Sequence, residues 1–164
     1  MKSLENNTVY MTLNSRGVPG TFHWGIFVTS SAPNGHYYHA TNKFGGWQLE
    51  ARKSTNPLNS MSLVLVYKIG SISSHDDLDQ LLRNTPADGS ASLRTGEAFT
   101  CRIWTKDALV ALHHNRVLTL SADIDTLEKQ AFELGTSLEP EIETGDRGAA
   151  VMSSTPSRSS SRRG

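Results

Sequence analysis

The stretch FHWGIFVT at residues 22–29 decides how we interpret the fold of this chain. It is rich in aromatic and β-branched residues, which favour a strand. The run SSAPNG at residues 30–35 follows and indicates a turn, because Asn-Gly favours positive φ. HYYHAT at residues 36–41 then predicts the returning strand of a hairpin.

Three further segments extend this hairpin into a sheet. Residues 9–13 alternate and predict an earlier strand, and residues 46–50 continue the meander after a Gly-Gly turn. SLVLVYKI at residues 62–69 is apolar and β-branched, which predicts a central strand. The sequence therefore predicts an α+β fold, in which an antiparallel sheet of four to five strands packs against helices.

Helical signals dominate the second half of the chain. Serines at residues 73–74 precede acidic residues and predict a helix that ends near residue 83. The run FTCRIWTKDAL at residues 99–109 predicts a second helix, which should extend to about residue 113. Residues 123–134 predict a third helix, ended by Gly135.

The composition changes from residue 139 onward. Residues 139–146 are acidic, and residues 152–164 are mostly Ser, Arg and Pro. Such a segment has too little to bury to offset the entropy cost of ordering it. We therefore expect a catalytic-like α+β domain at residues 1–138 and a disordered tail at residues 139–164.

Length and charge narrow the classes of protein to consider. The chain has 164 residues, the size of one domain, and a formal net charge of zero. This net charge argues against a broad surface for nucleic acid, which would need a basic face. We find no signal peptide and no run of the ~18 apolar residues that a membrane span requires. We expect a cytoplasmic protein without stable membrane insertion.

Cys101 is the only cysteine in the chain, and it falls in the first turn of the second expected helix. A helix N-terminus carries unsatisfied N–H groups and a partial positive charge, which favour the reactive thiolate form of a thiol. One cysteine also excludes an internal disulfide framework. A free cysteine on an apolar helix face is often just a small hydrophobe in the core, and this alternative stays open.

His23 and His39 lie on the two strands of the hairpin, and the turn can bring both side chains to one face. Cysteine acyl chemistry needs a thiolate, a base, a group that orients the base, and donors for the oxyanion. We predict Cys101 as nucleophile, His23 as base and His39 as the orienting group. A metal site at His23, His36 and His39 is an alternative, although no carboxylate joins them at a recognised spacing. We expect no metal and no organic cofactor.

The order of these motifs resembles that of the circularly permuted papain-like (NlpC-type) cysteine hydrolases and acyltransferases. HWGIFV, YYHAT and FTCRIW, beginning at residues 23, 37 and 99, are similar to the His, second His and Cys of the lecithin:retinol acyltransferase-like group. The PPPDE isopeptidase-like group is our second choice. The resemblance covers roughly residues 8–115 and implies the same roles for His23, His39 and Cys101. The long hairpin turn, and Thr100 and Arg102 beside the cysteine, depart from the acyltransferase pattern.

The function that we expect is cysteine-dependent acyl chemistry. A thiol hydrolase or acyltransferase would act on an ester, thioester or amide through an acyl-enzyme on Cys101, and its substrate would be a small-molecule or peptide acyl compound. One alternative is an isopeptidase or thiol protease of the PPPDE type. Another is a catalytically silent binding module on the same fold, because fold does not dictate activity. The sequence leaves open the oligomeric state and the choice between hydrolysis and transfer.

Overall fold

The computed structural model describes residues 3–145 and 148–153. Its strands are β1 (Thr8–Ser15), β2 (Phe22–Thr29), β3 (Gly35–Thr41), β4 (Gln48–Ser54), β5 (Leu63–Ser71) and β6 (Ala150–Ser153). Its helices are η1 (Pro57–Asn59, a 3₁₀ turn), α1 (His75–Asn84), α2 (Cys101–His114) and α3 (Ile124–Glu143). The predicted strands and helices all form, and β4 and α3 extend beyond their predicted ends.

The strands form a single mixed sheet in the order β4-β3-β2-β1-β5-β6. Neighbouring strands are antiparallel except β5 and β6, which run parallel. The α+β class is confirmed, but the expected antiparallel sheet of four to five strands is wrong, because a sixth strand is added in parallel. That strand is four residues long, too short to show the alternation by which a strand is recognised in a sequence.

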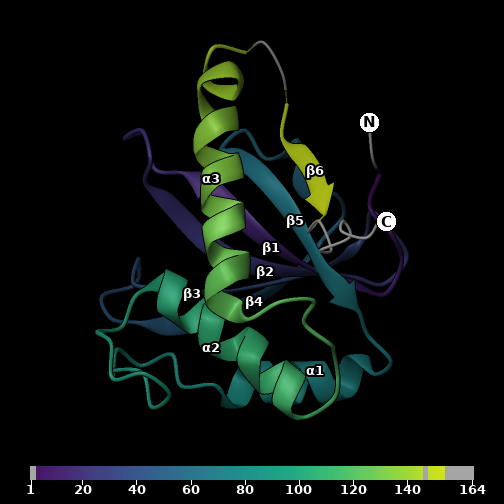
Figure 1. The fold of residues 1–164 in the computed structure, drawn as a ribbon, viewed down its shortest axis with the longest axis vertical. Coiled ribbons are helices and arrows are strands. Elements are labelled where there is room, and N and C mark those ends of the chain that lie inside the picture. The colour runs from purple at the N-terminus through teal and green to yellow at the C-terminus, as the bar shows by residue number, and fades with distance from the viewer. Residues whose placement is uncertain (1–2, 146–147, 154–164) are drawn as a thin grey trace, which may run out of the picture.

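The expected boundary at residue 138 falls inside α3, which continues to Glu143. Beyond it, Ala150 pairs with Leu65 and Val151 with Val66, so β6 lies alongside the central strand β5 (Figure 1). The described part of the expected tail is thus helix and strand rather than a disordered segment. Residues 146–147 and 154–164 lie outside the described residues.

Helices α2 and α3 pack on one face of the sheet, and α1 packs against α2 (Figure 1). Because side chains alternate along a strand, odd-numbered residues of β1 and even-numbered residues of β2 point toward these helices, where they form the main core. The opposite face carries a smaller cluster of buried residues: Leu4, Tyr10, Phe27, Leu63 and Val66. His23 and His39 share the alternation of Phe27 and Tyr37, so they belong to this second face, which we call helix-free because α1, α2 and α3 do not lie on it.

The third helix is longer than predicted because Gly135 does not end it. Gly135 is buried in the middle of α3, where a Cβ atom would come within 2.9 Å of Leu13 Cδ2 and 3.2 Å of Phe22 Cζ. The glycine therefore permits close packing of helix on sheet. A glycine at such a contact is indistinguishable, in sequence, from one that caps a helix.

Candidate functional site

Three side chains from consecutive strands form a hydrogen-bonded chain on the helix-free face. His23 Nε2 lies 2.7 Å from His39 Nδ1, and His39 Nε2 lies 2.6 Å from Glu50 Oε1. Lys43 Nζ lies 3.2 Å from the same carboxylate oxygen. The structure therefore brings the two predicted histidines together and adds a carboxylate that the sequence analysis did not assign.

The strand register explains this arrangement. Tyr38 pairs with Ile26 in β2, so His39 lies one step further along, diagonally across from His23. Their rings meet edge to face, with centroids 4.8 Å apart at 89°. In the next hairpin His39 lies directly opposite Glu50, where cross-strand side chains are close enough to bond.

Glu50 was missed, and the glycines at residues 45–46 do not reveal it. A two-residue turn at these glycines would place residue 39 opposite residue 52, whereas the observed register, with Thr41 opposite Gln48, places it opposite Glu50. The pairing of the histidine with the carboxylate therefore depends on the exact loop between β3 and β4. Neither the residue types nor their spacing alone showed which strand neighbours would meet.

The hydrogen-bond chain fixes which ring nitrogens carry protons. An ionised carboxylate can only accept, so His39 Nε2–H donates to Glu50. The Nδ1 atom of a neutral His39 is then an acceptor, and His23 Nε2–H donates to it. A neutral His23 is left with an unprotonated Nδ1, which is the form that a general base needs.

Both imidazoles favour the neutral form. Burial, together with the positive potential of His39 and Arg16, lowers the pKa of His23 to about 4. Burial also lowers the pKa of His39, and the hydrogen bond and negative charge of Glu50 oppose that change. The pKa of Glu50 is lowered: burial acts to raise it, and the hydrogen bonds from His39 and Lys43 outweigh burial. At neutral pH the hydrogen-bonded series of side chains therefore consists of the Glu50 carboxylate and two neutral imidazole rings.

Cys101 is the first residue of α2, as predicted. Thr100 caps the helix by accepting a hydrogen bond from the Ile103 N–H at 3.1 Å. The N–H groups of Cys101 and Arg102 occupy first-turn positions, which have no carbonyl partner within a helix. The helix start thus leaves backbone donors without a helical partner in the turn that carries the sulfur.

The sulfur itself lies against the backbone of β2. Cys101 Sγ accepts a hydrogen bond from the Trp24 N–H at 3.5 Å, and this nitrogen is bonded directly to the carbonyl carbon of His23. The pairing of β2 with β3 begins at Ile26, so the amide of Trp24 is free to point at the helix instead of at a strand. The thiol therefore contacts the backbone of the residue that follows the predicted base.

Ion pairs hold α2 in place over the sheet. Lys106, which is 4% exposed, bonds Asp125 Oδ1 at 2.7 Å and Glu128 Oε1 at 2.8 Å, both on α3. Arg102 pairs with the second oxygen of Glu128. A buried lysine needs such partners, and together they fix the first turns of α2 relative to α3.

The sulfur and the imidazoles nonetheless line different hollows. Cys101 is 3% exposed and borders a hollow of about 270 Å³ together with Arg16, Trp24 and Phe132. His23 and His39 border a hollow of about 390 Å³ on the helix-free face. Within the described residues, the hydrogen bond of the sulfur goes to the Trp24 amide and not to either ring.

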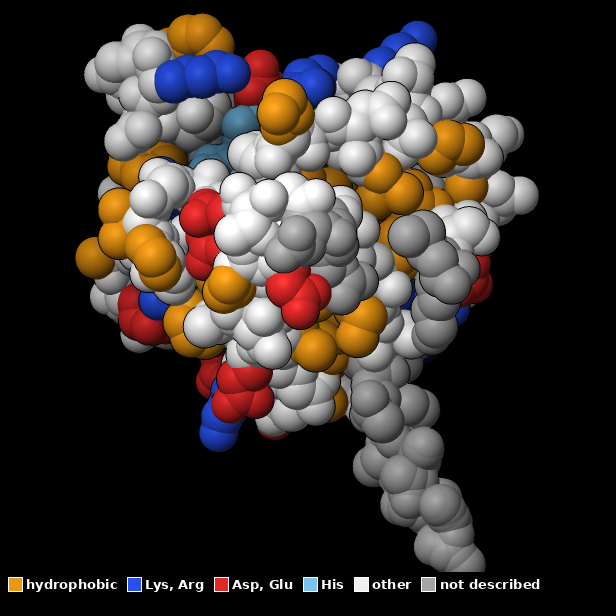
Figure 2. Space-filling view, turned by 90° about the horizontal axis from the view of Figure 1, so that it is seen from above, with side chains coloured by type: hydrophobic (Ala, Val, Ile, Leu, Met, Phe, Trp, Pro, Cys, Tyr) orange, Lys and Arg blue, Asp and Glu red, His pale blue; other side chains and the backbone are white. Residues whose placement is uncertain are grey.

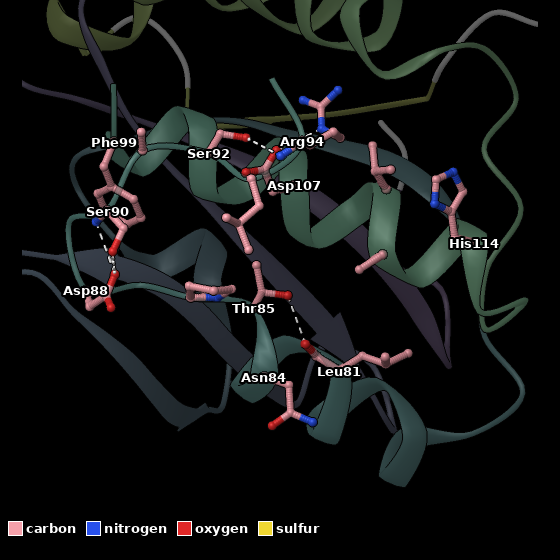
Figure 3. Close-up of a pocket in the computed structure, with 15 residues that line it drawn as sticks. Leu81, Asn84, Thr85, Asp88, Ser90, Ser92, Arg94, Phe99, Asp107 and His114 are labelled. Carbon is pink, nitrogen blue, oxygen red and sulfur yellow. Dashed lines mark hydrogen bonds and ion pairs between the residues drawn. The ribbon is translucent and has the colours of Figure 1, made fainter. Parts of the chain in front are cut away.

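A further hollow, of about 540 Å³, contains none of the predicted site residues. It lies between α1, the loop that follows it and the outer side of α2, as Figure 3 shows. In that loop Arg94 Nε forms an ion pair with Asp107 Oδ1 of α2 at 2.8 Å. The backbone N–H and the hydroxyl of Ser90 both donate hydrogen bonds to Asp88. Phe99 and Leu81 contribute apolar surface to its lining.

The alternative of a three-histidine metal site is not supported by the strand geometry. His36 lies an odd number of residues from His39 and therefore points to the other face of β3. Its ring lies beside Tyr38, with centroids 6.5 Å apart. In the described part of the chain, no group of three or more His, Cys, Asp or Glu residues is placed to hold a metal ion.

The surface seen in Figure 2 carries Lys and Arg beside Asp and Glu, and histidine surface is visible within a recess.

Across residues 3–145 and 148–153, none of the helices is both long enough and apolar enough to cross a membrane.

A protein-family model matches residues 9–119, the region that contains His23, His39, Glu50 and Cys101. Its description is a family of unknown function, DUF6540. The chain belongs to this family. The DUF6540 match ends before α3, so the long helix and β6 lie outside it. Comparison with curated proteins and with solved structures found no match.

Proposed function

We propose that this protein carries out cysteine-dependent acyl chemistry, with Cys101 as nucleophile and His23 as its base. The observation that carries the proposal is the hydrogen-bonded chain from Glu50 through His39 to His23. It supports the proposal because it leaves Nδ1 of a neutral His23 unprotonated, while burial lowers the pKa of that ring and the thiol lies against the neighbouring Trp24 amide at a helix N-terminus. The resemblance to papain-like hydrolases and acyltransferases points in the same direction.

In the proposed reaction His23 Nδ1 takes the thiol proton of Cys101. The sulfur attacks the carbonyl carbon of an ester, thioester or amide, and the first-turn N–H groups of α2 stabilise the negative charge on the oxygen. The bond to the leaving group breaks, and the leaving group takes its proton from His23. Water or an acceptor alcohol or amine, deprotonated by His23, then attacks the acyl-cysteine and restores the thiol.

His39 and Glu50 act as positioning residues in this scheme. Glu50 accepts from His39 Nε2–H, which directs His39 Nδ1 toward His23. When His23 becomes protonated during the reaction, the negative charge of Glu50 favours the resulting imidazolium. Replacing either residue should slow acyl transfer less than replacing His23.

A second candidate function is a catalytically silent binding module. The observation in its favour is that Cys101 is 3% exposed and borders a different hollow from the two imidazoles. In that case the sulfur is a core atom that satisfies the Trp24 amide, and the histidine chain is a structural network.

The test is the rate at which iodoacetamide alkylates Cys101 between about pH 5 and 9. A free thiol with a pKa near 8.5 is only a few per cent ionised at neutral pH, so removing a working base with His23→Gln should slow alkylation at pH 7 by about tenfold. His75→Gln, on exposed surface at the start of α1, is the matched control and should leave the rate unchanged. Cys101→Ser should give no adduct.

A rate that is the same with and without His23 contradicts the enzyme and favours the binding module. Where the base is confirmed, the substrate class is approached with acyl probes. Aryl esters test hydrolysis, and a ubiquitin-like electrophile tests the isopeptidase alternative, each against Cys101→Ser. An acyl-cysteine detected by mass spectrometry, and abolished in His23→Gln, would support the full scheme.

A further inference from the structure

The hollow beside His23 and His39 carries a cation that the described residues do not neutralise. Arg52 projects from β4, and its guanidinium lies over the Tyr37 ring, 5.2 Å from the centroid. None of the carboxylates in the described residues forms an ion pair with it, and the hollow has no acidic residue in its lining. The other lining groups are the two imidazoles, neutral hydroxyls and amides, and a few apolar groups.

The same hollow contains a buried hydroxyl without a partner. Thr12 is 2% exposed, and its Oγ1 is a buried side-chain atom that lacks a hydrogen bond within the described structure. Burial raises the pKa of Tyr37 and the nearby Thr12 hydroxyl opposes that rise, but Thr12 Oγ1 makes no hydrogen bond of normal geometry among the described residues. A buried polar atom left unpaired costs free energy, so its position beside a hollow indicates a bound group that completes it.

A glycine opens the space between these groups. Thr12 pairs with Gly25 across β1 and β2, and a Cβ atom at Gly25 would lie 2.7 Å from the Tyr37 hydroxyl. The missing side chain leaves room for the tyrosine ring over β2. The guanidinium over this ring and the threonine both border the same hollow.

We propose that this hollow binds a small polar organic acid, with its carboxylate at Arg52 and a second polar group at the Thr12 hydroxyl. The planar guanidinium fork matches a carboxylate in two parallel hydrogen bonds. A single guanidinium among neutral groups matches a monoanion better than a phosphate dianion. A volume of about 390 Å³ suits a small molecule.

This site goes beyond the proposed acyl chemistry, because Cys101 does not border it. Binding should therefore persist in Cys101→Ser, which separates a failure of this proposal from a failure of the catalytic one. His23 and His39 border the same hollow, so their ring signals report on its occupation.

The experiment is an NMR titration of the full chain at pH 7 with lactate, propionate, lactamide and inorganic phosphate. Lactate should bind saturably and shift the signals of Thr12, His23 and His39. Propionate lacks the hydroxyl and should bind about three- to tenfold more weakly. Lactamide lacks the charge and should not saturate the site. Equal binding of lactate and lactamide, or tighter binding of phosphate, would overturn the carboxylate assignment.

Two variants and one matched control locate the site. Arg52→Gln should weaken the binding of lactate at least tenfold, because it removes the charged guanidinium. Lys53→Gln removes the same charge from the neighbouring residue, which points to the other face of β4, and should leave lactate binding unchanged. An equal loss in both variants would show non-specific attraction and contradict the site.

Thr12→Val keeps the side-chain shape and removes only the hydroxyl. We expect it to reduce the preference for lactate over propionate to about one, with no fall in melting temperature. If that preference survived in the folded variant, the role assigned to Thr12 would be wrong.

Discussion

His39 Nε2 and Glu50 Oε1 lie 2.6 Å apart at directly opposed positions of β3 and β4. This single contact sets the protonation of the next ring, because His39 can accept from His23 only while its own Nε2 proton is given to the carboxylate. A carboxylate on the edge strand β4 therefore controls the tautomer of a histidine two strands away. The relationship holds whatever reaction the protein performs.

Glu50→Gln should keep the shape of this contact and remove its charge. The negative charge of Glu50 raises the pKa of both His23 and His39, so both values should fall in the variant. We expect a loss of about 1 kcal/mol in the free energy of unfolding at pH 7, because a charge-assisted hydrogen bond becomes a neutral one. Histidine NMR titrations and urea unfolding measure the two effects.

The matched control for this variant is Glu133→Gln, on the exposed side of α3. It removes the same charge without touching the histidines and should change neither measurement. Histidine pKa values that stay unchanged in Glu50→Gln would show that the carboxylate is protonated or turned away in solution.

Acid should destabilise the protein through His23 before any carboxylate titrates. The folded-state pKa of about 4 lies below the ordinary value of 6.5. As the pH falls from 7 to 5, the unfolded chain therefore binds a proton at this residue that the folded protein does not. Stability is lost in that direction, by roughly 1–2 kcal/mol after allowing for the partial exposure of the ring.

Urea unfolding at pH 7 and pH 5 checks this prediction. In His23→Gln the difference in the free energy of unfolding between pH 7 and pH 5 should shrink by about 1–2 kcal/mol, since glutamine does not titrate. His114→Gln, an exposed residue at the end of α2, should leave the difference as in the native protein. A native protein that is equally stable at both pH values would contradict a neutral, buried His23.

The sheet core and the helix starts could be predicted because their signals are local. Alternation predicted β1, aromatic and β-branched residues predicted β2, and the serines at residues 73–74 predicted the start of α1, where Ser74 is the N-cap. The pairing of His23 with His39 followed from one hairpin. The contact with Glu50 depended on the register of a second hairpin, and β6 on a parallel pairing between residues far apart in the sequence, neither of which a local pattern reveals.

The end of α3 shows how packing overrides a local signal. Gly135→Ala would normally stabilise a helix by about 1 kcal/mol. Here the added Cβ would press on Leu13 and Phe22, at 2.9 and 3.2 Å, so we expect a net loss of about 1 kcal/mol or more. Thermal unfolding measures it, and exposed Thr136→Ala on the same helix should show a small gain. A stabilised Gly135→Ala would mean that the helix can move away from the sheet.

The buried carboxylate of Glu139 ties α3 to the loop that borders the thiol. Its Oε1 accepts from the Gly20 N–H at 3.0 Å and its Oε2 from the Ser15 hydroxyl at 2.7 Å, and the residue is 3% exposed. Glu139→Gln replaces one acceptor oxygen by a donor and should cost about 1–3 kcal/mol. Because Gly20 lines the hollow beside Cys101, the same change should loosen that loop and raise the alkylation rate of the thiol under native conditions.

Hydrogen exchange at residues 16–21 and the iodoacetamide rate measure these two consequences independently of overall stability. Exposed Glu133→Gln again serves as the control, since it changes the charge of α3 without touching the loop. Faster alkylation with faster loop exchange would show that access to Cys101 is governed by this anchor. Faster exchange with an unchanged alkylation rate would show instead that the sulfur is reached from another direction.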